Sequence, residues 1–297
     1  MILLRSLAAV VGVASKVGAA ITKSPEPCAI TYWFPFGDSY TTTGFDPNDT
    51  LPSVGNPLGN PAFPGETGGG GENFVGFDTT VYNRSLILTY DYAVGGAVID
   101  PTLVSPITLS LPDGVDEFLV GAGKKPATAP WTSENALFSV WIGINDIGNT
   151  FYLGGDRAAF SDTLLDAYFV QVQRLVEAGG RNFLFINVPP TYRAPLIIDF
   201  FPDQLDVAKT VIEGFNSKLA ARVKLFKAKN RGAKTWIWDA YTSFNTILDA
   251  PQRYGFVDDS SFGEPGDFWG NSYHPASAAH QIFAKQISEL LAGTPWF

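Results

Sequence analysis

The segment at residues 31–40 reads TYWFPFGDSY, and it decides how the fold begins. The part before the glycine is mostly aromatic or apolar, which is typical of a short buried strand. The strand is expected to end at Gly37, after which Asp38 and Ser39 form a turn. In parallel sheets, ligands bind at the carboxyl ends of the strands. This turn therefore places a hydroxyl group where chemistry is expected.

Further along the chain, short apolar runs alternate with long amphipathic stretches. The runs expected to be strands cover residues 86–89, 137–142, 182–188 and 235–238. The stretches expected to be helices cover residues 159–178, residues 204–228 and a last segment that opens at His274 and Pro275. This alternation predicts an α/β fold, a three-layer α/β/α sandwich around a mostly parallel five-stranded sheet. No repeat or clean linker divides the chain, so a single domain is expected over residues 21–297.

A long segment at residues 44–73 is crowded with Gly, Pro, Asn and Asp. Irregular segments of this length are usually functional or mobile. Residues 68–71 are consecutive glycines without the Gly-Lys-Ser/Thr ending of a phosphate loop, and we expect a flexible turn there. Residues 46–49 are expected to form a solvated loop rather than a calcium site.

Composition excludes several classes of function. The chain has 297 residues, of which 45% are hydrophobic, and this suffices for a large core. Its formal net charge of −9 argues against nucleic acid or an anionic membrane as a partner. Cys28 is the only cysteine, and His274 and His280 are the only histidines. These counts exclude an intrachain disulfide and offer no basis for a metal site, and no cofactor is expected.

Residues 1–20 resemble a secretory signal peptide. Arg5 supplies a positive charge, and the residues after it are rich in Ala, Val and Gly. Lys16 interrupts the apolar run, and a plain N-terminal helix is the alternative. We expect a secreted, extracellular protein, and the Asn-x-Ser/Thr triplets at Asn48 and Asn83 fit a glycoprotein.

The hydroxyl of Ser39 needs a neighbouring base, because a serine is a weak nucleophile until its proton is removed. His274 lies in the loop before the last expected helix and is free to reach a strand end. His280 lies inside that helix on another face, and we expect it to be a packed helix residue. The plainer alternatives are a turn serine at Ser39 and a helix-capping role for His274.

Four blocks resemble the motifs of the GDSL, or SGNH, hydrolases. They are FGDSY at residues 36–40, YAVGGA at 92–97, GIND at 143–146 and NSYHP at 271–275. Their order and spacing match the family over about residues 32–292. The residues that flank the first and last blocks are similar to the fungal secreted members grouped as carbohydrate esterase family 16. The resemblance implies a flavodoxin-like three-layer fold and ester hydrolysis through an acyl-enzyme.

The resemblance also implies roles for individual residues. Ser39 is the nucleophile, and its backbone N–H is one donor of an oxyanion hole. The N–H of Gly96 and the side-chain amide of Asn145 are the other donors. An ordinary turn glycine at Gly96 and a helix cap at Asn145 are the alternatives. Asp38 is expected to hold the turn through backbone hydrogen bonds.

The chain departs from the family pattern at residue 271, where the family has aspartate three residues before the histidine. The Asn271 amide can accept the Nδ1–H of His274 and fix its tautomer, but it carries no charge. A backbone carbonyl that orients a Ser-His dyad, or an acid of the same loop such as Asp267, is the alternative. If the amide orients the histidine, Asn271→Asp is expected to be tolerated.

The substrate implied by the resemblance is an acetyl ester of xylo- or other plant-cell-wall oligosaccharides. Aromatic residues near the motifs, Trp33, Phe74, Trp269 and Tyr273, would suit stacking on sugar rings. A broad short-chain esterase or a lipase uses the same machinery, and an inactive carbohydrate-binding descendant is a further alternative. The oligomeric state is left open by the sequence.

Overall fold

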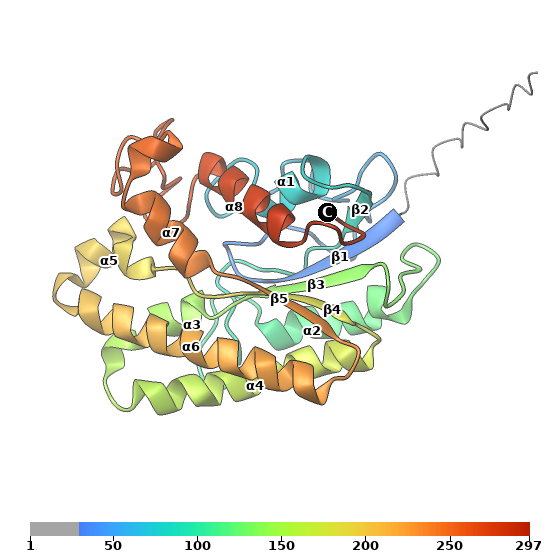
Figure 1. The fold of residues 1–297 in the computed structure, drawn as a ribbon, viewed down its shortest axis with the longest axis horizontal. Coiled ribbons are helices and arrows are strands. Elements are labelled where there is room, and N and C mark those ends of the chain that lie inside the picture. Colours follow the sequence, from blue (N-terminus) through green and yellow to red (C-terminus); the bar gives the residue numbers. More distant parts are fainter. Residues whose placement is uncertain (1–29) are drawn as a thin grey trace, which may run out of the picture.

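The structure is a computed structural model, and it describes residues 30–297 (Figure 1). The expected signal peptide at residues 1–20 and Cys28 lie outside the described residues. Within residues 30–297, no helix is both long enough and apolar enough to cross a bilayer.

A parallel sheet of five strands lies at the centre of the molecule. The strands are β1 (Ile30–Gly37), β2 (Leu86–Thr89), β3 (Ala136–Trp141), β4 (Asn182–Ile186) and β5 (Lys234–Trp238). Their order in space is β2-β1-β3-β4-β5, and every neighbouring pair is parallel. The predicted parallel sheet is confirmed. Because the strand order reverses beside β1, the carboxyl ends of β1 and β3 flank the crevice where such sheets bind ligands.

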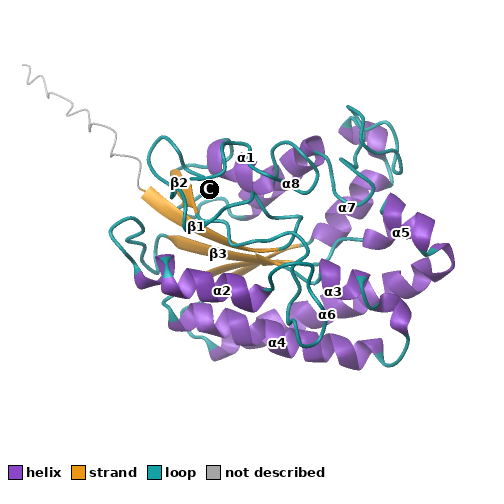
Figure 2. Ribbon diagram, turned by 180° about the vertical axis from the view of Figure 1, so that it is seen from behind, coloured by secondary structure: helices purple, strands orange, loops and turns teal. Residues whose placement is uncertain are grey.

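Helices cover both faces of the sheet (Figures 1 and 2). The helices are α1 (Phe74–Thr80), α2 (Leu111–Val120), α3 (Ile144–Gly148), α4 (Arg157–Glu177), α5 (Pro195–Phe200), α6 (Leu205–Lys229), α7 (Ala240–Leu248) and α8 (Ser277–Leu290). Helices α1 and α8 pack together on one face, and α2, α4 and α6 cover the other. The three-layer prediction is therefore confirmed, and α4 and α6 match the two long helices expected from periodicity.

The last helix begins later than expected. It starts at Ser277, with Ala276 as its N-cap in extended conformation, so His274 and Pro275 remain in the preceding loop. Helices α1, α2 and α7 were not expected from the sequence, because each is short and has too few turns to show a clear apolar period.

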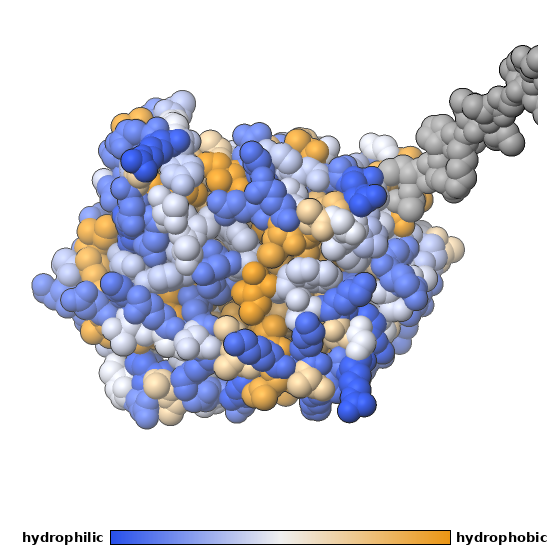
Figure 3. All heavy atoms as spheres, viewed as in Figure 1, coloured by the Kyte–Doolittle hydropathy of each residue, from blue (hydrophilic) through white to orange (hydrophobic). Residues whose placement is uncertain are grey.

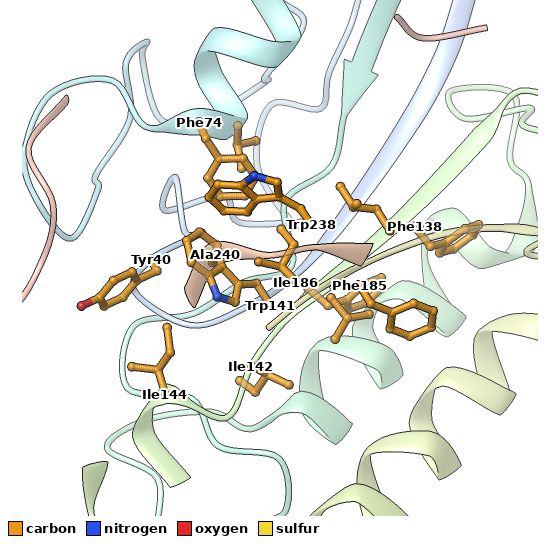
Figure 4. Packing of buried hydrophobic residues seen from close by; sticks show 14 of the residues in the cluster. Tyr40, Phe74, Phe138, Trp141, Ile142, Ile144, Phe185, Ile186, Trp238 and Ala240 are labelled. Carbon is orange, nitrogen blue, oxygen red and sulfur yellow. The ribbon is translucent and has the colours of Figure 1, made fainter. Parts of the chain in front are cut away.

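Trp141 at the end of β3 joins the core to the loops that carry the site (Figure 4). Its ring lies edge-on to Tyr40, Phe74 and Trp238, with centroid distances of 5.6, 5.4 and 5.6 Å. Its indole N–H donates to the Asn187 carbonyl at 3.0 Å. One buried side chain thus fixes the turn after β1 against α1 and the far strand, β5.

The edge strand β5 lies on the side of the molecule shown in Figure 3, where apolar surface forms a band across the middle of the view. The strand is short and starts at the exposed Lys234. Short strands with a lysine are a common way to disfavour pairing of a sheet edge with another chain.

Candidate active site

The turn after β1 presents the Ser39 hydroxyl at the crevice. The Asp38 carbonyl accepts hydrogen bonds from the N–H groups of Thr41 (3.0 Å) and Thr42 (2.9 Å), and its Oδ1 accepts from the Tyr40 N–H at 3.0 Å. A Cβ at Gly37 would lie 2.5 Å from the Trp141 carbonyl oxygen, so only glycine allows this close packing. Asp38 therefore has the structural role that the sequence predicted.

The tertiary fold brings His274 to this serine from the far end of the chain. Nε2 of His274 lies 2.7 Å from Ser39 Oγ. The ring packs against Tyr40 at a centroid distance of 5.3 Å, and the Tyr40 hydroxyl donates to the Tyr273 carbonyl. Burial lowers the pKa of His274 to about 4, so the imidazole is neutral at neutral pH and able to accept a proton.

Asn271 lies on the other side of the imidazole. Its Oδ1 accepts from Nδ1 of His274 at 3.0 Å and from the backbone N–H groups of Tyr273 (3.0 Å) and His274 (2.9 Å). Its Nδ2 donates to the Gly68 carbonyl at 2.8 Å. Because each of these backbone partners can only donate or only accept, they determine which amide atom faces the ring. The proton of the neutral imidazole is thereby placed on Nδ1, and the lone pair of Nε2 faces Ser39.

Asp267, the alternative acid of the same loop, is directed elsewhere. Its carboxylate accepts from the Glu264 N–H at 3.0 Å, and the side chain is buried. Among the alternatives left open by the sequence, the geometry favours the Asn271 amide.

The glycine run at residues 68–71 forms the expected turn, but its first half is tightly packed at the site rather than flexible. A Cβ at Gly68 would lie 2.4 Å from the Ser39 carbonyl oxygen and 2.9 Å from Cδ2 of His274. A Cβ at Gly69 would lie 1.9 Å from the Pro275 carbonyl oxygen. Glycine is needed here because the backbone lies directly against the turn that carries Ser39 and the loop that carries His274.

Hydrogen-bond donors surround the space next to Ser39 Oγ. Gly96 has a φ of +78°, and a Cβ there would lie 2.6 Å from Cβ of Ile107. Asn145 Nδ2 donates one hydrogen to the Ala97 carbonyl at 2.8 Å, which leaves its second hydrogen for a ligand. Within residues 30–297, the backbone N–H groups of Ser39 and Gly96 donate to no other group. These are donors that can bind a developing oxyanion.

A buried carboxyl group joins the two segments that carry these donors, and no role was expected for it from the sequence. Asp146 follows Asn145 and accepts from the Ile99 N–H with both oxygens, at 3.0 and 3.2 Å. Burial raises the pKa of Asp146 to about 7 and that of Asp38 to about 8. The only signal for Asp146 in the sequence was its position directly after Asn145 in the block GIND.

His280 does not reach the site. Its side chain is buried, its ring lies parallel to Phe74 at 6.2 Å, and burial lowers its pKa to about 3. The expectation of a packed helix residue agrees with this position.

Ser39, Gly96, Asn145 and His274 line one pocket of about 460 Å³. Its walls are largely apolar, and its aromatic members are Tyr152, Phe200, Phe201 and Tyr273. Within residues 30–297, no group of three or more His, Cys, Asp or Glu side chains is arranged to hold a metal ion.

The aromatic residues expected to stack on sugar rings are mostly in the core. Trp33, Phe74 and Trp269 are fully buried, and Trp33 donates its indole N–H to Ser139 Oγ at 2.8 Å. That expectation is wrong for these three, because core packing against neighbouring side chains hides their rings. Tyr273 does line the pocket.

Comparison with known proteins agrees with this geometry. A family model for GDSL-like lipase/acylhydrolase matches residues 34–287. The chain is 38% identical over 285 residues to an acetylesterase of Thermothelomyces thermophilus, covering 93% of this chain and 94% of the relative. It is 26% identical to a thermolabile hemolysin of Vibrio parahaemolyticus over 89% of this chain and 64% of that protein.

A solved structure of an acetyl-xylooligosaccharide esterase variant from Geobacillus stearothermophilus has the same fold. It aligns with a TM-score of 0.50 and 16% identity, over 88% of this chain and 94% of that one. The extent of the family match settles the classification, and the chain belongs to the GDSL-like lipase/acylhydrolase family of carboxylic ester hydrolases.

Proposed function

We propose that this protein is a serine esterase that removes acetyl groups through an acyl-enzyme. Ser39 Oγ attacks the ester carbonyl while His274 Nε2 takes its proton. The N–H groups of Ser39 and Gly96 and the Asn145 amide bind the oxyanion of the tetrahedral intermediate. The observation that carries this proposal is the 2.7 Å contact between Ser39 Oγ and His274 Nε2 beside unpaired donors.

The second half of the reaction uses the same groups. When the tetrahedral intermediate collapses, the imidazolium of His274 gives its proton to the leaving alcohol, and the acetyl group stays on Ser39. Water then attacks the acyl-enzyme while His274 again acts as the base. The second tetrahedral intermediate collapses, acetate leaves, and His274 returns the proton to Ser39 Oγ. Asn271 keeps Nε2 directed at the serine throughout, because Nδ1 remains bound to its Oδ1.

The substrate that we propose is an acetylated plant-cell-wall oligosaccharide, hydrolysed outside the cell. The name of the Thermothelomyces relative supports the acetyl group. The leader-like sequence of residues 1–20 supports secretion, and the exposed side chain of Asn48 suits glycosylation. The apolar wall of the pocket favours one alternative function, a broad short-chain esterase or lipase. Hydrolysis rates for acetate, butyrate and longer esters of one alcohol distinguish this alternative from an acetylesterase.

The test is the substitution Ser39→Ala. It removes the nucleophile, so kcat/KM for p-nitrophenyl acetate and for an acetylated xylo-oligosaccharide falls by more than about a thousandfold. Ser288→Ala is the matched control, since this half-buried serine of α8 bonds only to the Lys285 carbonyl and does not line the pocket. A fluorophosphonate probe labels the wild type and the control but not Ser39→Ala. Substantial turnover or labelling of the Ser39 variant would refute the proposal.

A further inference from the structure

One wall of the pocket takes no part in the proposed chemistry. It is formed by α5 and the residue after it, together with the turn after α3. We call it the alcohol wall, and its members are Tyr152, Leu196, Phe200 and Phe201. All four side chains are apolar or aromatic at the face that meets the pocket, and no sequence motif assigned them a role.

The position of the alcohol wall follows from the direction of proton transfer. The leaving oxygen must lie within hydrogen-bond reach of His274 Nε2, which protonates it. The α5 end of the wall is attached to the histidine loop, because the Leu196 N–H donates to the Ser272 carbonyl at 2.8 Å. Ile107, by contrast, contacts Gly96 on the side of the oxyanion donors. The alcohol part of the ester therefore leaves toward α5.

Packing between rings holds part of the alcohol wall in place. Tyr152 and Phe201 are stacked at a centroid distance of 4.8 Å and an interplanar angle of 19°, and the buried Phe151 supports both rings. Phe200 is 73% exposed and Tyr152 is 39% exposed, so both present ring surface to solvent at the pocket. Exposed aromatic faces next to a reactive centre are suited to a flat, partly apolar partner.

One polar side chain at the pocket, that of Asn149, is free to bind a ligand beside the alcohol wall. Asn149 follows α3 and is exposed, and within residues 30–297 its side-chain amide makes no hydrogen bond. Its backbone N–H caps α3 by donating to the Asn145 carbonyl at 2.9 Å, which holds the residue close to the oxyanion donors. An amide can both donate to and accept from a hydroxyl group.

We propose that the alcohol wall binds the sugar ring that carries the acetyl group. The C–H face of a pyranose stacks on Phe200 and Tyr152, and the Asn149 amide bonds to a ring hydroxyl. This inference rests on the proposed esterase function and adds to it the residues that select the alcohol. The contact lies away from the reacting carbonyl, so it forms equally in the ground state and the transition state. Such contacts lower KM and leave kcat unchanged.

The experiment compares Phe200→Ala, Tyr152→Ala and Phe63→Ala. Phe63 is a matched control, because it is 53% exposed and does not line the pocket. The substrates are ethyl acetate, which has no ring, p-nitrophenyl acetate, and a methyl xylopyranoside acetylated at one position. For the acetylated xyloside, both wall variants raise KM about tenfold, as expected from the loss of one buried ring face. Their kcat for this substrate and all constants for ethyl acetate stay at wild-type values, and Phe200→Tyr restores KM.

Several outcomes overturn the inference. An unchanged KM for the xyloside in both wall variants shows that the ring does not bind there. A KM increase for p-nitrophenyl acetate alone identifies an aryl alcohol as the occupant instead of a sugar. When ethyl butyrate is measured beside ethyl acetate, a larger effect of the wall variants on the butyrate assigns the wall to the acyl chain. Failure of the esterase function itself is distinguished by a wild type that hydrolyses none of the three acetates.

Discussion

Replacing Asn271 by aspartate tests how the histidine is held. If the amide orients His274, the sequence predicts that this change is tolerated, because a carboxylate at this position can also stabilise the imidazolium. The structure changes the expectation, because Asn271 Nδ2 donates to the Gly68 carbonyl at 2.8 Å. In Asn271→Asp, a second carboxylate oxygen takes that position, and two acceptors face one another without a proton between them.

The backbone at Gly68 has little room to move away. It lies against the carbonyl oxygen of Ser39, and Gly69 lies against that of Pro275. Leaving buried acceptors unpaired costs about 1–3 kcal/mol. If the introduced carboxylate turns to avoid Gly68, it also turns away from Nδ1 of His274. Returning the carboxylate to the orientation that holds Nδ1 then carries this cost of about 1–3 kcal/mol. We therefore expect kcat/KM to fall by about 5- to 150-fold, since each 1.4 kcal/mol is a factor of about ten.

The pH profile distinguishes this effect from a merely structural one. A carboxylate beside the imidazole favours its charged form, so the pKa of His274 rises in Asn271→Asp. The acid limb of kcat/KM then moves to higher pH, whereas Asn271→Ala lowers the rate by at least about tenfold through loss of orientation, without that shift. Asp267→Asn is the control from the same loop and is expected to keep the wild-type rate and profile.

The assay is initial-rate hydrolysis of p-nitrophenyl acetate between pH 4 and 8, with the unfolding temperature of each variant measured in parallel. Wild-type kcat/KM in Asn271→Asp would show that the Gly68 carbonyl does not decide which residue is accepted at position 271. Wild-type activity in Asn271→Ala would remove the amide as the orienting group and favour a backbone carbonyl.

Two further predictions concern pH. Burial lowers the pKa of His274 to about 4, so the base is already neutral at mildly acidic pH. We therefore expect kcat/KM to stay near its plateau down to about pH 5. An acid limb of the wild-type profile centred near pH 6.5 would contradict this. Burial raises the pKa of Asp38 to about 8. Between about pH 4 and about pH 8 the folded state therefore keeps a proton that the unfolded state has released. Because the unfolded state binds fewer protons, the stability of the folded state falls as the pH rises through this range. Asp38→Asn should flatten the unfolding temperature over that range, and curves that stay parallel to wild type would rule out this contribution.

Local patterns in the sequence were sufficient to predict the architecture. The apolar runs that became β1 to β5 are short and bounded by turn residues, and the long helices α4 and α6 carry a clear apolar stripe. Such patterns depend on neighbours within a few residues, so they can be read without knowledge of the fold. Helices α1 and α7 were missed because they are too short to show such a pattern.

The candidate site was predictable to the extent that its motifs are local. Ser39 and Asn145 each follow a strand, and His274 precedes the last helix, so their places at the strand ends follow from the order of elements. The family resemblance added Gly96, whose positive φ then explained why a glycine stands there.

Tertiary structure alone decided the contacts between segments that are distant in the chain. The hydrogen bond from Asn271 to Gly68 joins residues 203 positions apart, and no local pattern signals it. Burial is equally non-local, because whether Trp33 or Phe200 shows its ring to solvent depends on what packs over it. The sequence by itself therefore determined the elements and the reactive groups, while packing between distant segments determined how His274 is held and which surface meets the substrate.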